Sequence, residues 1–76
     1  MNEEQQKEIR QFFDNEIDMV KGWMRLPTIW GTKTECIATW EIRCLGVERI
    51  LHKLFPKDYD FIDDCIKSNL RELQKL

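Results

Sequence analysis

The chain has 76 residues, of which 42% are hydrophobic and 34% charged, and its formal net charge is −2. This length allows one small domain at most, and the composition is that of a globular protein, which argues against disorder. The 12 Lys and Arg residues are scattered, which disfavours a nucleic-acid surface, and no apolar run approaches the roughly 18 residues of a membrane span.

Two features bear on the compartment and on metals. The first ten residues, "MNEEQQKEIR", lack the basic start and apolar core of a signal peptide. Cys36, Cys44 and Cys65 make an odd number with no Cys-x-x-Cys, so we expect free thiols that pack as small hydrophobes. Cys36, Cys44 and His52 do not converge on a metal, since each step of eight residues rotates about 80° around a helix. We expect a cytoplasmic protein without metal or other cofactor.

The first periodic segment predicts a helix over about residues 3–25. Asn2 is a suitable N-cap. The helix ends either at Gly22, as a C-terminal cap, or as late as Arg25, because the residue before Pro27 is disfavoured in helices. Its broad apolar face consists of Ile9, Phe12, Phe13, Ile17, Met19, Val20, Trp23 and Met24.

A short turn follows and contains Ile29 and Trp30. One interpretation is that both side chains fold back as a lid over the open end of a bundle and touch Trp23 or Trp40, and this is the one we favour. The other interpretation is an exposed aromatic anchor for a protein partner, because Trp dominates interface hot spots.

The second helix is predicted over about residues 33–55, before Pro56. "TKTE" fits a capping box, with Thr32 as N-cap and Glu35 at the third helical position. The main apolar face consists of Ile37, Trp40, Cys44, Val47, Leu51, Leu54 and Phe55.

This helix also has a second apolar strip, which points largely away from the main face. It consists of Ala38, Ile42 and Leu45, with Gly46 beside them. A glycine inside a helix costs about 1 kcal/mol relative to Ala, which close packing would explain. Either a neighbouring helix of the same chain covers the strip, which we favour, or the strip is an interface to another subunit or partner.

The third helix is predicted over about residues 59–75, with Asp58 or Asp60 as its cap. A seam with the spacing of coiled-coil core positions runs along it through Tyr59, Ile62, Ile66, Asn69, Leu73 and Leu76. No strand pattern occurs and the joints are short. The expected fold is a single all-α domain, either an up-down-up three-helix bundle or a helical hairpin with a C-terminal helix.

Three polar residues interrupt the apolar stripes: Glu16, Arg43 and Asn69. Residue counts place them at similar height in an up-down-up bundle. We therefore predict a shared polar layer, with an ion pair between Glu16 and Arg43 and a hydrogen bond from Asn69 to one of them, because a buried carboxylate needs a partner. The alternatives are a Glu16 that reaches water at a rim and a Glu16 that awaits the cation of a ligand.

No catalytic motif is present, so we do not expect an enzyme. We expect a small interaction module, an adaptor, inhibitor or regulator of the kind common among accessory proteins of bacteria and phages, which binds another protein and forms a homo-oligomer. Its expected partner-binding residues are Ile29, Trp30, Ala38, Ile42, Leu45 and Gly46. The alternative is a small-ligand or nucleotide site between subunits that uses Arg43, Arg49 and His52. A DNA-binding regulator is the third option, although the carboxylates at the start of the last helix would repel DNA.

Overall fold

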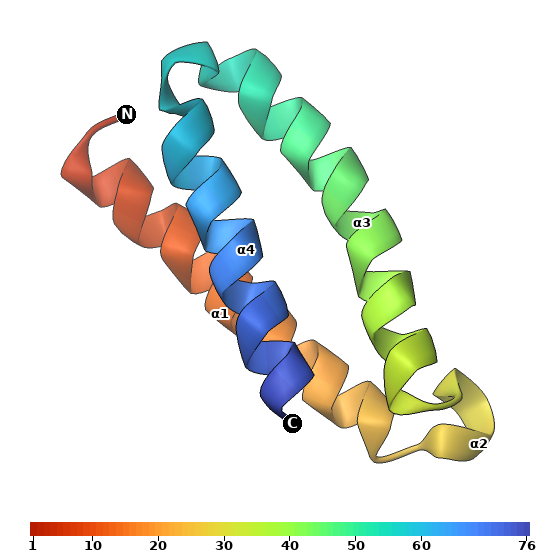
Figure 1. The fold of residues 1–76 in the computed structure, drawn as a ribbon. Helices are drawn as coiled ribbons and strands as arrows, with labels where there is room; N and C mark the ends of the chain where they lie inside the picture. The colour runs from red at the N-terminus through yellow and green to blue at the C-terminus, as the bar shows by residue number, and fades with distance from the viewer.

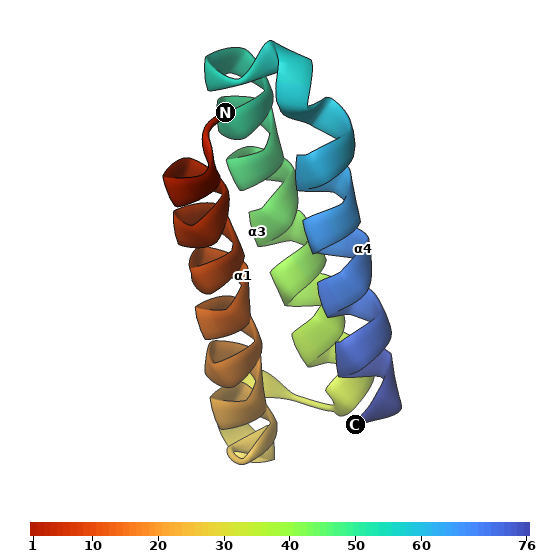
Figure 2. The ribbon, with the colours of Figure 1, turned by 90° about the vertical axis from the view of Figure 1, so that its left-hand side faces the viewer.

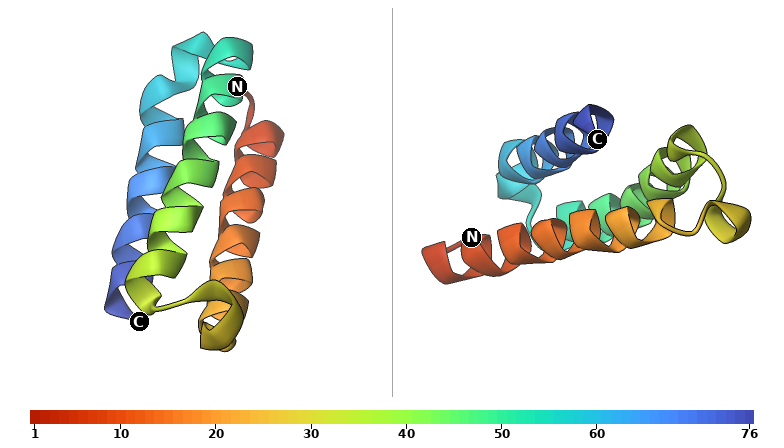
Figure 3. Two further views of the ribbon diagram at one scale, coloured as in Figure 1. Left: turned by 90° about the vertical axis from the view of Figure 1, so that its right-hand side faces the viewer. Right: turned by 90° about the horizontal axis from the view of Figure 1, so that it is seen from below.

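A computed structural model describes all 76 residues, and its elements in chain order are α1 (Glu3–Met24), α2 (Pro27–Trp30), α3 (Lys33–Leu54), η1 (Pro56–Asp58) and α4 (Tyr59–Lys75). The all-α prediction is confirmed. The long helices α1 and α4 run in one direction and α3 runs in the other, so the bundle is up-down-up (Figure 1). Each of the three long helices contacts the other two, and Figures 2 and 3 show them side by side. None of the helices combines the length and apolarity that a membrane crossing requires.

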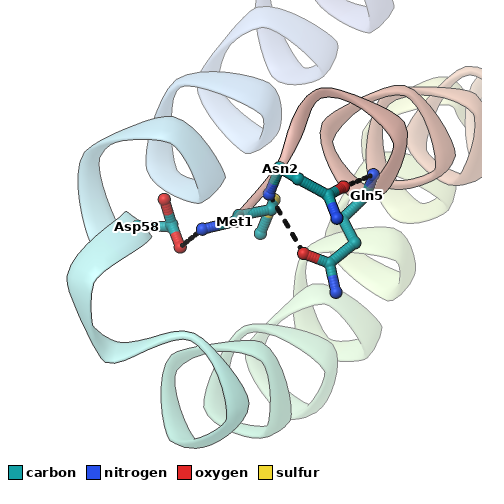
Figure 4. A network of polar contacts seen from close by, with 4 residues as sticks. All are labelled: Met1, Asn2, Gln5 and Asp58. Atoms are coloured by element: carbon teal, nitrogen blue, oxygen red, sulfur yellow. Dashed lines mark hydrogen bonds and ion pairs between the residues drawn. The ribbon is translucent and has the colours of Figure 1, made fainter.

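The start of α1 follows the local sequence. The Asn2 side chain accepts a hydrogen bond from the Gln5 backbone N–H at 2.8 Å, and the Gln5 side chain accepts one from the Asn2 N–H at 3.1 Å (Figure 4). This reciprocal pair satisfies two N–H groups that have no partner within the helix. At the other end, α1 continues through Gly22 and its C-cap is Arg25, so Gly22 does not end it.

The start of α3 is the predicted capping box. The Thr32 hydroxyl accepts from the Glu35 N–H at 3.2 Å, and the Glu35 carboxylate accepts from the Thr32 N–H at 3.2 Å. Gly31 precedes the box with φ of 87°, a left-handed backbone conformation that only glycine adopts without strain. A Cβ there would also lie 2.8 Å from the Glu35 carboxylate carbon. Glycine at this position lets the chain leave α2 and enter the box.

The prediction that Asp58 or Asp60 caps α4 is wrong. Asp58 stands at the N-cap position, but no side chain caps the helix. The Asp58 carboxylate instead accepts from the Met1 ammonium at 3.0 Å, across the end of the bundle (Figure 4). An opposite charge at 3.0 Å competes successfully with the neutral N–H groups of the first turn.

The core lies between the three long helices. Its eleven buried apolar residues are Phe13, Ile17, Val20, Cys36, Ile37, Trp40, Cys44, Leu51, Ile62, Cys65 and Leu73. The predicted faces are therefore correct along their centres. They are wrong at the ends of the bundle, where Leu54, Tyr59 and Leu76 each remain at least half exposed.

Candidate functional site

The ion pair between α1 and α3 is confirmed. Arg43 Nε donates to Glu16 Oε1 at 2.7 Å. The Glu16 side chain is 5% exposed and the Arg43 side chain is 49% exposed, so the carboxylate is enclosed while the guanidinium reaches water. The hydrogen bond and the negative charge of Glu16 raise the pKa of Arg43 above its usual value. Glu16 is thus partnered within the chain, and neither rim exposure nor an awaited cation describes it.

The predicted place of Asn69 in that polar layer is wrong. Asn69 is buried, and its side-chain Nδ2 donates to the backbone carbonyl of Phe13 at 2.7 Å rather than to Glu16 or Arg43. The reason is the side from which each helix approaches α1: α4 brings Asn69 to the α1 backbone, whereas α3 brings Arg43 to Glu16. The two polar contacts fix α1 against two different neighbours.

The second strip of α3 is uncovered, which corrects the favoured expectation that a neighbouring helix covers it. We call the surface formed by Ala38, Ile42, Leu45 and Gly46 the α3 outer face. All four residues are exposed, Ile42 by 72% and Leu45 by 58%. The buried residues of α3 lie on its opposite side, towards both neighbouring helices, and this strip faces outward.

A groove of about 400 Å³ runs beside this face, between α3 and α4. Its lining is mainly apolar and includes Ile42 and Leu45 from α3 and Ile66 and Leu70 from α4, with Glu41 and Glu48 as its two carboxylates. We call it the α3–α4 groove. Ile66 was expected in the seam of the last helix, whereas Leu70 was not among the predicted apolar positions. The spacing of four residues between these two side chains would have indicated a shared apolar strip.

The turn residues form a second apolar surface at the end of the molecule. Trp30 stacks on Trp23, with ring centroids 4.6 Å apart and an angle of 18° between the planes, and is still 39% exposed. Ile29 is 71% exposed and Leu26 is 50% exposed, so the lid interpretation is wrong for Ile29. We call Leu26, Ile29 and Trp30 the corner patch. The single helical turn α2 lies outside the bundle end (Figure 3), and Ile29 is exposed there.

The residues of the ligand-binding alternative do not converge on a common pocket. Arg43 is engaged by Glu16, and His52 stacks on Tyr59 with centroids 4.1 Å apart while its Nδ1 lies 3.8 Å from Glu48 Oε1. Neither these two residues nor Arg49 lines any of the four pockets.

The three cysteines are free and buried, as predicted. Burial raises the pKa of Cys44 to about 12 and also raises the pKa of Cys65, because a thiolate loses its hydration inside the core. A protonated, enclosed thiol is a poor nucleophile, so these groups serve packing. No group of three or more His, Cys, Asp or Glu side chains is arranged to hold a metal ion.

Comparison of the chain with models of protein families, with curated proteins and with solved structures found no match. The candidate contact surfaces of the chain are the α3 outer face with its groove and the corner patch.

Proposed function

We propose that the chain is a small helical interaction module, an adaptor, inhibitor or regulator that acts by binding another protein and associates with copies of itself. The observation that supports this most directly is the exposure of Ile42 and Leu45 beside an apolar groove. Contiguous apolar surface on a small monomer marks a contact surface for another macromolecule more often than scattered apolar residues do.

The size of the molecule supports the same conclusion. Only 13 of 76 residues are buried. Small domains bury a low fraction of their surface and gain stability when another chain covers their apolar faces. A partner on the α3 outer face would remove the exposed side chains of Ile42 and Leu45 from water.

The corner patch supplies a second contact surface with a different character. Trp30 presents a large aromatic surface, and the stack on Trp23 holds its ring in place. Aromatic side chains that are already immobilised lose little conformational entropy on binding, and Trp is enriched among the residues that dominate interface energies. We assign the corner patch to the protein on which the module acts.

The nucleotide-binding alternative has less support. A nucleotide site needs convergent donors around a hollow. Arg43 already pairs with Glu16, and Arg49 and His52 line no pocket.

The proposal is tested by quantitative binding to a purified partner. Proteins captured by the full chain from an extract of the cells that produce it are purified, and their affinities are measured by calorimetry. We expect Trp30→Ala to weaken binding at least about tenfold for a protein at the corner patch, and Ile42→Arg to do so for a protein that contacts the α3 outer face. The matched control is Ser68→Arg, which adds the same charge on the side of α4 opposite the groove.

Two results would overturn the proposed function. One is that every captured protein binds the two variants as tightly as it binds the wild type and the control. The other is that nucleotides, screened by thermal shift, stabilise the wild type in a manner that Arg49→Gln abolishes, which would establish the ligand-binding alternative.

A further inference from the structure

Nothing in the chain covers the α3 outer face. The nearest heavy atoms to a Cβ built on Gly46 lie beyond 4 Å, once the adjacent residues and the helix's own backbone are set aside. Ala38, Ile42 and Leu45 follow one another at steps of four and three residues, and Arg49 continues the strip after another four. This is the spacing of a helix face that packs along a second helix. The small residues Ala38 and Gly46 leave room for such a helix to come close.

The charges along α3 are ordered by position. Glu35 and Glu41 are exposed in the N-terminal part of the helix, and Arg49 and Lys53 are exposed in the C-terminal part. Three charges depart from this order: Lys33, which donates to the Gln74 carbonyl of α4, Arg43, which pairs with Glu16, and Glu48, which is half-buried on the groove side. The remaining four charges, acidic towards one end of α3 and basic towards the other, are complementary to those of a second copy that runs in the reverse direction. Opposite charges that meet in this way select partner and orientation.

We propose that a second copy of this chain covers the α3 outer face, with the two α3 helices antiparallel and a two-fold axis between Ile42 and Leu45. This proposal rests on the proposed function and names one partner of that surface. In this register Ile42 of each copy lies against Leu45 of the other, and the small Ala38 lies under the long side chain of Arg49. Arg49 then reaches the acidic part of the second copy, at Glu41.

The parallel arrangement is disfavoured by the same residues. It would place Arg49 against Arg49 at the same height, and like charges in an interface are repelled. A two-fold arrangement uses one surface twice, so each favourable contact of the antiparallel register occurs twice. The self-complementary charge order is the reason for choosing a second copy rather than a different protein for this face.

The dimensions of the molecule allow a stable dimer. The bundle extends 40 × 19 × 17 Å between Cα positions. One of its long sides is therefore comparable to the roughly 800 Å² that each partner buries in a standard interface. The α3 outer face, the groove-lining Ile66 and Leu70 and the flanking charges all belong to one such side. The corner patch lies at the end of the molecule and remains free for another protein.

The first test uses the two glycines that lie inside long helices. A Cβ at Gly46 or at Gly22 of α1 meets nothing within 4 Å in the single chain, so Gly46→Gln and the matched control Gly22→Gln both favour the folded helix. We expect sedimentation equilibrium of the purified wild type, from about 1 μM to about 1 mM, to show a mass of twice 9.2 kDa at the upper end. Gly46→Gln should raise the dimer dissociation constant at least about tenfold, whereas Gly22→Gln should leave it unchanged.

The second test addresses the register. Arg49→Glu should weaken the dimer, because it places a carboxylate against the acidic part of the second copy. Combining Arg49→Glu with Glu41→Arg should restore the wild-type dissociation constant to within about threefold. Circular dichroism of each variant checks that the helices are retained.

Several results would overturn the proposal. A wild type that remains at 9.2 kDa over the whole concentration range removes the second copy from this face. The proposed function is then decided separately, by the calorimetric affinities for purified partners. A dimer that Gly46→Gln does not weaken uses another face. A dimer that Arg49→Glu does not weaken, or that the double substitution does not restore, has another register.

Discussion

The ion pair between Glu16 and Arg43 should respond very unequally to the loss of either partner. The Glu16 side chain is 5% exposed and the Arg43 side chain is 49% exposed. Arg43→Met removes the only charged partner of an enclosed carboxylate. Glu16→Met replaces that carboxylate with an apolar side chain of similar size and leaves a guanidinium that already reaches water.

The expected magnitudes follow from this difference. Breaking a buried ion pair so that one charge stays buried alone costs about 3–5 kcal/mol, and we expect about 3 kcal/mol for Arg43→Met because water is close on the Arg43 side. We expect Glu16→Met to change the free energy of unfolding by less than about 1 kcal/mol, because an apolar replacement for a buried charge is often neutral or stabilising. The double substitution should resemble Glu16→Met, which gives a coupling energy of about 3 kcal/mol in magnitude, the full cost of Arg43→Met.

Urea unfolding followed by the fluorescence of the three Trp residues measures all four proteins. The protein concentration must be kept equal, since dimerisation would make stability depend on concentration. In thermal unfolding, Arg43→Met should lower Tm by about 12–24 °C, from about 4–8 °C per kcal/mol for a domain of this size. The reasoning is refuted if Glu16→Met costs as much as Arg43→Met, or if the coupling energy is below about 0.5 kcal/mol.

Three further predictions concern groups in the core and at the corner. Because the pKa of Cys44 is raised to about 12, the folded thiol keeps its proton where the unfolded thiol loses it. Its contribution to stability is therefore complete below about pH 9 and is lost towards pH 12. Cys44→Ala should make the urea midpoint fall less steeply over that range, and an unchanged slope would contradict the raised pKa. Trp30→Ala removes the stack on Trp23 and should lower the free energy of unfolding, measured in urea, by about 1 kcal/mol. Trp30→Phe keeps an aromatic ring against Trp23 and should lose less. Equal losses in the two variants would show that the stack contributes nothing. Asn69→Ala removes the donor to the Phe13 carbonyl and should lower the free energy of unfolding by about 1–2 kcal/mol. Amide hydrogen exchange should become faster in the turn of α1 that contains Phe13. Unaltered exchange in that turn would argue against the contact.

The sequence by itself determined the features that depend on neighbours along the chain. Helix positions follow from apolar residues that recur every 3.6 residues, and the start of α3 follows from the Thr32–Glu35 box, because both are satisfied within a few turns of one helix. The pair of Glu16 and Arg43 was also predictable. A carboxylate in the middle of an apolar stripe requires a partner, and only one basic residue stood at a matching height on the facing helix.

Only the tertiary structure decided which side of each helix its neighbours use. α3 has two apolar strips, and its sequence does not say that both neighbours pack on the same one and leave Ile42 and Leu45 exposed. The partners of Asn69 and Asp58 likewise depend on the approach of distant segments, the α1 backbone in one case and the Met1 ammonium in the other. The packing of the three helices together decides which faces are buried and which polar groups meet. Local sequence constrains each helix by itself, whereas burial and hydrogen bonding between helices are satisfied only when the helices are packed.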